Sequence, residues 1–315
     1  MGFLALGVLH ADWAPAQSHP GYPVKPVRLV TAAAGAGGDL AARVVAAGLT
    51  VLWGQPVVID NRGGSAVIPV ELVTRAAPDG YTLLAFGSTL WHLALMQNVP
   101  YDPIKDLAPI TLVERTPMIV VVHPALPVTS ILELVALAKK RPGQIHYASG
   151  ISGATTHLFP ELFKAMAGVD IVRVPYKGGA PAITGLIGGE TQLMFANASG
   201  AGPHVRAGRI RALAVTSVQR SALFPDLPTV AASGLPGYEA SSAQCLFAPA
   251  AIPAAIVRQL HRQVIGILER AEVKQRFLQG GSEVAATTPG ELAAYIKADM
   301  LKMGKIIKEA GIGAN

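Results

Sequence analysis

The sequence predicts an α/β fold of two domains, the first of which is discontinuous. Its 315 residues correspond to about two domains of roughly 150 residues each. After residue 20 one pattern recurs: a short run rich in β-branched residues, a turn rich in Gly, Ser or Ala, and an amphipathic stretch. This alternation is typical of parallel strands connected by helices. Two helical stretches close the chain with too little strand sequence for another domain, so we expect them to pack on the first one.

The same pattern places the individual elements. The expected strands are 27–31, 57–60, 81–86, 118–122, 145–149, 171–174, 193–196 and 212–216. The expected helices include 40–52, 131–140, 157–167, 180–187, 253–269 and 289–310. The first lobe is therefore expected at 20–121 and 242–315 and the second lobe at 122–241, with the chain crossing between them near 120–122 and 240–246.

Composition excludes several classes of protein. Apolar residues make up 51% and charged residues 15% of the chain, against about 25% charged in ordinary soluble domains, so intrinsic disorder is not expected. The net charge is +6, but the cations are dispersed and their longest run is Lys139–Arg141, so we expect no nucleic-acid partner. No apolar stretch reaches the roughly 18–20 residues that a membrane span needs. The single cysteine, Cys245, can form neither an internal disulfide nor a thiolate zinc site.

The first residues have the pattern of an export signal. The apolar run GFLALGVL precedes Ala14, Pro15 and Ala16, which form an A-x-A cleavage pattern. We therefore expect residues 1–19 to be a signal-peptide-like segment that is removed near Ala16. An ordinary flexible amino terminus is the alternative.

A glycine-rich loop follows the first expected strand. It holds Gly37 and Gly38, and Asp39 stands where the side chain could cap the next helix. Glycines let backbone N–H groups face a cleft, and a helix start adds partial positive charge, so the loop could hold an anion. A plain tight turn is the alternative. The loop is not a dinucleotide fingerprint, because Leu40 stands where that motif needs a third glycine.

A second loop, after the strand ending near Ser149, offers hydroxyl and backbone N–H groups together. Its candidate binding residues include Gly153, Thr156 and His157. Because proline fits best in the first turn of a helix, Pro160 places the helix start near His157 and leaves the hydroxyl groups in the loop. A capping or structural role for His157 is favoured over a role as a catalytic base.

Two further strand ends carry candidate binding residues. Tyr176, Lys177 and Gly178 follow the strand at 171–174, with a proline two residues into the next expected helix, and Asn197 follows the strand at 193–196. Tyr176 could contact a ligand or pack as a half-buried side chain, Lys177 could be a solvated cation, and Asn197 could form a turn. In open α/β sheets, ligands bind at the carboxyl ends of the strands, which is where these residues lie.

No enzyme template fits the chain. It has no nucleophile elbow, phosphate-binding Walker loop or zinc-protease helix, and its eight histidines lack metal-ligand spacing. We therefore expect a binding protein rather than an enzyme, with no metal and no cofactor.

An ordered set of phrases running from Tyr22 to the end resembles the Bug-type periplasmic receptors of tripartite tricarboxylate transporters. These phrases are YPVKPVRLV, GQPVVIDNR, APDGYTLL, PYDPIKDLAPITL, VPYKGGAPAITGLIGGE, RALAVTS and LPTVAASGLPGYEA. The resemblance implies a two-lobed periplasmic binding protein fold (Venus flytrap, type II) that holds a small carboxylate in its cleft. It also implies a location in the periplasm, membrane transporter subunits as partners, a monomeric receptor and no chemistry on the ligand.

The resemblance also implies which residues bind. The family's binding loops correspond to Gly37, Gly38, Ser88, Thr89, Ser149, Gly153, Thr156, His157, Tyr176, Lys177, Gly178 and Asn197, with Asp39 as a helix cap. The chain departs from the family's usual residues at several of these loops, among them Arg173, where His is frequent. A ligand-sensing flytrap that partners a signalling receptor is the alternative function, and neighbouring genes for transporter subunits or for a kinase would separate the two.

Overall fold

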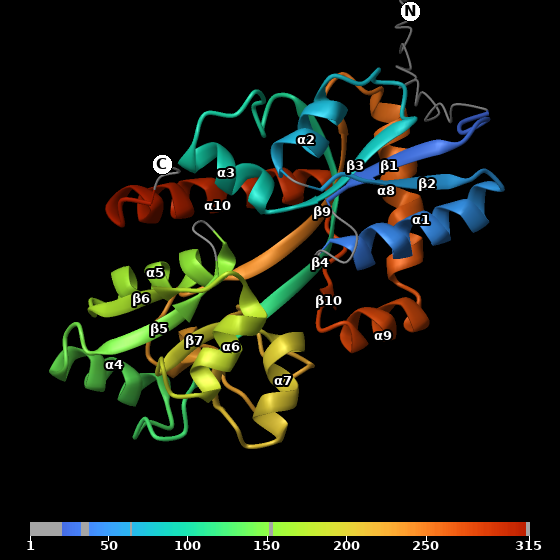
Figure 1. Ribbon diagram of the computed structural model, residues 1–315. Coiled ribbons are helices and arrows are strands. Elements are labelled where there is room, and N and C mark those ends of the chain that lie inside the picture. Colours follow the sequence, from blue (N-terminus) through green and yellow to red (C-terminus); the bar gives the residue numbers. More distant parts are fainter. Residues whose placement is uncertain (1–20, 33–37, 64, 151–153, 313–315) are drawn as a thin grey trace, which may run out of the picture.

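The computed structural model describes residues 21–32, 38–63, 65–150 and 154–312. It forms two lobes connected by two long strands (Figure 1). Its strands are β1 Val27–Thr31, β2 Val57–Asn61, β3 Thr82–Gly87, β4 Leu107–Val122, β5 Ile145–Ser149, β6 Ile171–Pro175, β7 Leu193–Asn197, β8 Arg211–Val215, β9 Ser241–Pro249 and β10 Glu283–Val284. Its helices are α1 Asp39–Trp53, α2 Val67–Thr74, α3 Thr89–Met96, α4 Ile131–Lys140, α5 Thr155–Ala167, α6 Gly179–Ile187, α7 Ala198–Arg206, α8 Ala254–Leu268, α9 Ala271–Gln279 and α10 Pro289–Glu309.

The first lobe is a sheet covered by helices on both faces. Strands β2, β1 and β3 are parallel, and β9 and β4 continue the sheet in antiparallel pairing. Apolar side chains of α1, α8 and α9 form one core with one face of the sheet. Those of α2, α3 and the first part of α10 form the other core. Strands buried on both faces are nearly continuous in hydrophobic residues, as in VRLV and TLLAF.

The second lobe repeats this plan with fewer strands. Strand β5 lies between β6 and β7 in parallel pairing, and β7 and β8 pair antiparallel with β4. Helices α4 and α5 cover one face, and α6 and α7 cover the other. Both lobes thus place a helix directly after most strands, which is the arrangement that the sequence pattern predicts.

Strands β4 and β9 carry the chain between the lobes. In β4, residues up to Pro117 pair with β9 in the sheet of the first lobe, and residues from Met118 onward pair with β7 and β8 in the second. The first crossing therefore lies at Pro117 and Met118, a few residues before the expected 120–122. The second expected crossing, 240–246, overlaps the start of β9, whose pairing with β4 begins at Ser241.

Helix α10 packs on both lobes, whereas residues 242–315 were expected in the first lobe. It begins with a capping box between Thr288 and Glu291. Leu292 and Ile296 lie in a core of the first lobe, whereas Met303 and Ile306 lie in the core of the second. An apolar stripe over 21 residues is long enough to cover both lobes.

Seven of the eight expected strands match observed strands to within one residue at each end. The first part of β4, strands β9 and β10, and the helices α2, α3, α7 and α9 were not among the expected elements. All four of these helices are only eight or nine residues long, and α2, α3 and α7 have weak or interrupted patterns, such as the proline inside α7. In the described ranges no helix is long and apolar enough to cross a membrane. The expected signal-peptide segment, 1–19, lies outside the described residues.

Candidate functional site

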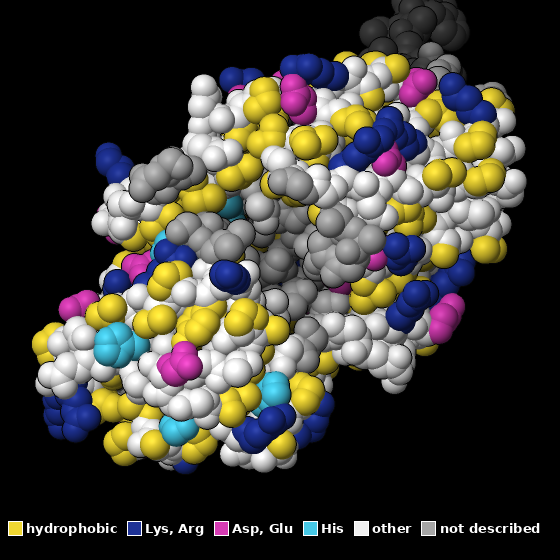
Figure 2. All heavy atoms as spheres, viewed as in Figure 1, with side chains coloured by type: hydrophobic (Ala, Val, Ile, Leu, Met, Phe, Trp, Pro, Cys, Tyr) yellow, Lys and Arg dark blue, Asp and Glu magenta, His cyan; other side chains and the backbone are white. Residues whose placement is uncertain are grey.

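Five helices follow strands whose carboxyl ends point towards the junction of the two lobes. Helices α1 and α3 follow β1 and β3 of the first lobe, and α5, α6 and α7 follow β5, β6 and β7 of the second. Unpaired N–H groups and the macrodipole make each helix start favourable for a negative charge. The surface is hollowed between the lobes, and Lys and Arg side chains are scattered rather than gathered on the visible face (Figure 2).

The start of α1 differs from the expectation at Asp39. Gly38 is the N-cap and Asp39 is the first helical residue, so the side chain of Asp39 does not cap the helix. Its carboxylate instead pairs with Arg43 at 2.9 Å and accepts a hydrogen bond from the Asn61 amide at 3.2 Å. Asp39 therefore holds α1 against the end of β2. Gly37, which was expected beside Gly38, lies outside the described residues.

Ser88 and Thr89 lie at the start of α3. The Ser88 N–H donates to the carbonyl oxygen of Ala243 at 3.0 Å, which connects this loop to β9. The Ser88 side chain is buried, yet its hydroxyl has no hydrogen-bond partner in the described structure. Thr89 is exposed. A buried hydroxyl without a partner is uncommon and identifies a position where a ligand or water can complete the bonding.

The loops of the second lobe are tied together by side chains. Arg173 on β6 donates from Nε to the Ser149 hydroxyl at 2.7 Å and from Nη2 to the Gly150 carbonyl oxygen at 3.0 Å. The Gly150 N–H donates to the Thr156 hydroxyl at 2.9 Å. The Tyr176 N–H donates to the Ser149 carbonyl oxygen at 2.8 Å. The ends of β5 and β6 and the start of α5 therefore form one unit.

Helix α5 begins earlier than expected. It starts at Thr155 rather than near His157, so Thr156 lies in its first turn. Pro160 lies in the second turn, where it removes one helical hydrogen bond. The Thr156 hydroxyl supports the preceding loop instead of remaining open. Gly153 lies outside the described residues.

His157 is buried, with 6% of its surface exposed. Burial, with a smaller contribution from the Arg173 guanidinium, lowers the pKa of His157 to about 4. The imidazole is therefore neutral at physiological pH. A neutral imidazole keeps one N–H donor and one acceptor, so His157 adds no positive charge to the site.

The remaining expected residues have different surroundings. The Tyr176 hydroxyl donates to Glu190 within its own lobe at 2.9 Å. Lys177 and Asn197 are exposed, and Gly178 and Asn197 are the N-caps of α6 and α7. A pocket of about 310 Å³ lies between these helices and brings Thr156, Gly179, Asn197 and His204 to one wall.

Two side chains near the site were not among the expected binding residues. Arg173 supplies the one guanidinium that joins Ser149 and Gly150, and its departure from the family's usual residue was the available signal. Gln244 on β9 lies against Gly38 and Gly87 of the first lobe. No motif in the sequence indicates Gln244, because only the pairing of β9 with β3 brings it there.

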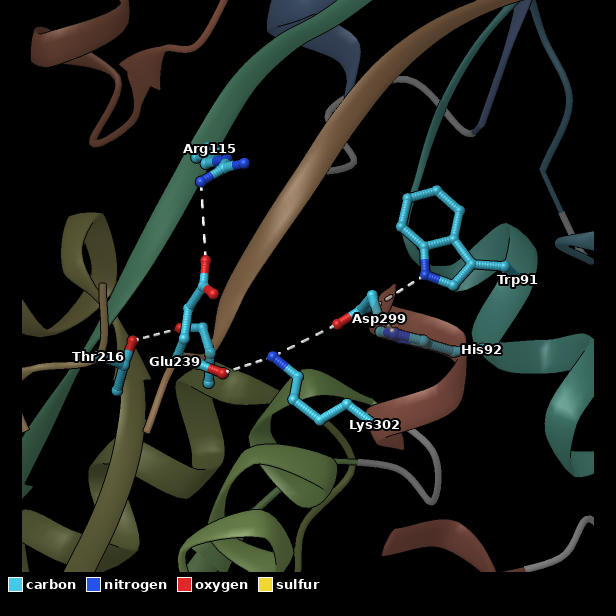
Figure 3. A network of polar contacts seen from close by, with 8 residues as sticks. Trp91, His92, Arg115, Thr216, Glu239, Asp299 and Lys302 are labelled. Carbon is cyan, nitrogen blue, oxygen red and sulfur yellow. Dashed lines mark hydrogen bonds and ion pairs between the residues drawn. The ribbon is translucent and has the colours of Figure 1, made fainter. Parts of the chain in front are cut away.

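A polar network holds α10 where it passes from one lobe to the other (Figure 3). Asp299 accepts a hydrogen bond from Trp91 Nε1 at 2.8 Å and lies 2.6 Å from His92 Nε2. One helical turn later, Lys302 donates to the Glu239 carbonyl oxygen at 2.9 Å. The first two contacts are to α3 of the first lobe, and the third is to the segment that enters β9 from the second lobe. The network therefore connects α10 with both lobes.

The described residues contain no group of His, Cys, Asp or Glu side chains that could hold a metal ion. Cys245 is buried on β9, and burial raises the pKa of its thiol. A buried, protonated thiol is a poor nucleophile.

Comparisons with known proteins agree with this geometry and with the resemblance seen in the sequence. Residues 41–312 match the tripartite tricarboxylate transporter family receptor, TctC. Protein BugT of Bordetella pertussis is 34% identical over 295 residues, which cover 92% of this chain and 90% of BugT. The structure of R. palustris Rpa4515 with adipate is 36% identical, with a TM-score of 0.76, and the match covers 93% of this chain and 99% of that chain. The structure of the periplasmic binding protein BugD is 31% identical, with a TM-score of 0.73, and the match covers 93% of this chain and 100% of BugD.

These matches confirm the expected two-lobed fold and show binding proteins rather than enzymes. The family match extends over most of the chain and includes both lobes. The chain belongs to the tripartite tricarboxylate transporter family of receptors, as a Bug-type member.

Proposed function

We propose that this receptor captures a small carboxylate in the cleft between its lobes and delivers it to a tripartite tricarboxylate-type membrane transporter. The observation that carries the proposal is that five helices, from both lobes, follow strands whose carboxyl ends point towards the crossing between the lobes. Backbone N–H groups at helix starts are preorganised donors for an anion. When the lobes close on a carboxylate, donors from both sides surround it.

The proposed ligand-binding residues come from every strand end named above. They are Gly37, Gly38, Ser88, Thr89, Ser149, Gly153, Thr156, His157, Tyr176, Lys177, Gly178 and Asn197. Asp39 orients α1 through Arg43 and Asn61 and does not touch the ligand, because its carboxylate would repel another carboxylate.

Charge and relationship support a carboxylate over a neutral solute. Arg173 places a cation directly behind the Ser149–Gly150 turn, while His157 on the same side stays neutral. Hydrogen bonds to a charged group contribute about 1.5–3 kcal/mol each, so a few of them provide micromolar affinity, which needs about 8.2 kcal/mol. The related Rpa4515 is known with adipate, a dicarboxylate.

We place the mature receptor in the periplasm. The related BugD is a periplasmic binding protein, and the apolar run with its A-x-A pattern at 1–19 is of the exported type. Mass spectrometry of the periplasmic protein should find a chain that begins near residue 17. An intact chain from Met1 recovered only from the cytoplasm would contradict export.

A thermal-shift screen tests the ligand class. Mono-, di- and tricarboxylates are compared with their amides, which have the same length without the charge. A carboxylate present at about 100 times its dissociation constant stabilises the folded state by about 2.7 kcal/mol, and the amide does not. Stabilisation by amides and sugars but by no carboxylate would overturn the proposal.

An uptake assay tests delivery. Cells that lack the receptor gene should lose uptake of the carboxylate found in the screen, and the wild-type gene should restore it. Unchanged uptake together with a lost transcriptional response to the same carboxylate would replace transport by sensing.

A further inference from the structure

Gln244 occupies a central position on the first-lobe side of the cleft. It lies on the crossing strand β9, where it pairs with Gly87 of β3 on one side and with Glu114 of β4 on the other. The side chain is half-buried, between the buried neighbours Ala243 and Cys245. It therefore lies at the end of β3, next to the start of α3.

Two glycines make room for the Gln244 amide. A Cβ atom at Gly38 would lie 2.6 Å from Gln244 Oε1, and a Cβ atom at Gly87 would lie 2.8 Å from Gln244 Nε2. The amide group thus rests against the N-cap of α1 and against the residue before the N-cap of α3. Its oxygen is nearer to α1 and its nitrogen is nearer to α3.

Two hydrogen-bonding groups beside the starts of α1 and α3 are without a partner among the described residues. The buried Ser88 hydroxyl has no hydrogen-bond partner there, and the half-buried Gln244 amide makes no hydrogen bond to a described residue. The second lobe differs, because Arg173, Ser149 and Thr156 bond to one another and to the Gly150 backbone. The free amide and hydroxyl therefore belong to the face that meets the ligand.

A neutral amide needs both a hydrogen-bond acceptor and a donor from a ligand, whereas backbone N–H groups need only an acceptor. Nε2 is a donor and Oε1 is an acceptor. A carboxylate oxygen can accept from Nε2 but has no hydrogen to give to Oε1. A hydroxyl group can both donate and accept, and it therefore satisfies the amide when the cleft closes and excludes water.

We propose that Gln244 is a specificity-determining residue, which makes the cleft prefer carboxylates that carry a hydroxyl group next to the carboxylate over unsubstituted ones of the same length. This inference rests on the proposed function, since it assumes a carboxylate in the same cleft. The ligand's carboxylate meets the helix starts, and its hydroxyl meets the Gln244 amide. Ser88 supplies the adjoining hydroxyl.

Matched pairs of ligands test the inference by titration calorimetry. The pairs are lactate and propionate, malate and succinate, and 2-hydroxyglutarate and glutarate. In the wild-type protein at least one hydroxylated member should bind about tenfold more tightly than its partner, which corresponds to about 1.4 kcal/mol. The Gln244→Met variant keeps the length of the side chain and removes the amide. It should bind the hydroxylated ligand about tenfold more weakly and the unsubstituted ligand within about twofold of the wild type.

Gln275→Met on the exposed face of α9 is the matched control and should leave every affinity unchanged. Thermal unfolding of both variants verifies that they are folded. Equal affinity within every pair for the wild type, or a preference retained by Gln244→Met, would overturn the role of Gln244 and leave the carboxylate function intact. Absence of binding by every carboxylate to the folded wild type would overturn both.

Discussion

The two faces of the cleft differ in how much of their hydrogen bonding is already used. On the second lobe, Arg173, Ser149, Gly150 and Thr156 form one bonded unit. On the first lobe, the buried Ser88 hydroxyl has no partner among the described residues, and the half-buried Gln244 amide makes no hydrogen bond to one. The second lobe also has an unpartnered group, His204 Nδ1, in the pocket beside α6 and α7. The second-lobe loop at Ser149 and Gly150 is therefore held in place by its own side chains, whereas the Ser88 hydroxyl and the Gln244 amide of the first lobe are left for a ligand or water to bond. Preformed donors recognise a charge, and unsatisfied side chains discriminate between ligands.

Glu114 of the first lobe and His157 of the second are buried titratable groups whose pKa values shift in opposite directions. Burial raises the pKa of Glu114 on β4 to about 7, although a hydrogen bond from the Ser282 hydroxyl opposes the shift. Burial lowers the pKa of His157 to about 4. Desolvation disfavours the charged form in both cases, so both groups favour the neutral state.

Removing the Arg173 guanidinium should have the largest effect on stability and on ligand binding. Arg173→Met deletes the donors to Ser149 and Gly150 and leaves the carbonyl oxygen of Gly150 with only the long hydrogen bond from the Ser149 hydroxyl, at 3.2 Å. We expect the free energy of unfolding to fall by about 3–4 kcal/mol and ligand affinity to fall at least tenfold, measured by urea denaturation and calorimetry. Arg43→Met, which breaks only a surface ion pair, should change stability by less than about 1 kcal/mol. Wild-type affinity in Arg173→Met would show that the bonded unit is not needed.

The pH dependence of stability should separate the two buried groups. The folded His157 has a pKa of about 4 and the ordinary value is 6.5, so the unfolded chain binds more protons between these values. The contribution of His157 is therefore present above pH 6.5 and is lost as pH falls towards 4. For Glu114 the folded pKa is about 7 and the ordinary value is 4.5, so its contribution is present below pH 4.5 and is lost as pH rises towards 7. Each amounts to about 3 kcal/mol at 1.36 kcal/mol per pKa unit.

Between about pH 4.5 and 6.5 the free energy of unfolding rises with pH because of His157 and falls with pH because of Glu114. The two effects cancel in the wild type, so single variants are needed to measure each. Relative to the wild type, His157→Gln should lose stability as pH rises through this window, and Glu114→Gln should lose stability as pH falls. Urea denaturation at several pH values measures both. Parallel profiles for the wild type and both variants would show that neither group changes its pKa on folding.

A larger side chain at Gly38 should weaken ligand binding more than it lowers the free energy of unfolding. The Cβ atom of Gly38→Val would meet Gln244 Oε1, the end of a flexible side chain that can move away. We expect affinity for the identified ligand to fall about tenfold, which is about 1.4 kcal/mol, with the variant still folded. Gly290→Ala, where an added Cβ meets nothing within 4 Å, is the control. A folded Gly38→Val protein with wild-type affinity would mean that this loop is only a turn.

Asp39→Asn should have the smallest effect. The carboxylate lies in the first turn of α1 and pairs with the exposed Arg43. Loss of its charge should lower the free energy of unfolding by roughly 0.5 kcal/mol, through the helix macrodipole and a surface ion pair. A loss above about 2 kcal/mol would point to a role beyond these contacts.

The sequence alone determined most secondary structure and the order of the binding loops. Strands such as β1 and β5, and helix α4, lie where the pattern predicts, because buried β-branched runs and amphipathic stripes are local signals. The ordered sequence segments also indicated the family, which the comparisons confirm. Helix α3 was not predicted, because its eight residues are mostly apolar and show little helical periodicity of hydrophobic and polar residues.

Only the tertiary structure decided which side chains meet. Gln244 reaches Gly38 through the pairing of β9 with β3, although the two residues are far apart in the chain. Arg173 reaches Ser149 because β5 and β6 are adjacent parallel strands. The passage of α10 from one lobe to the other likewise depends on contacts of Asp299 with α3 and of Lys302 with Glu239. Such contacts follow from packing between distant segments, and local sequence patterns carry no information on distant partners.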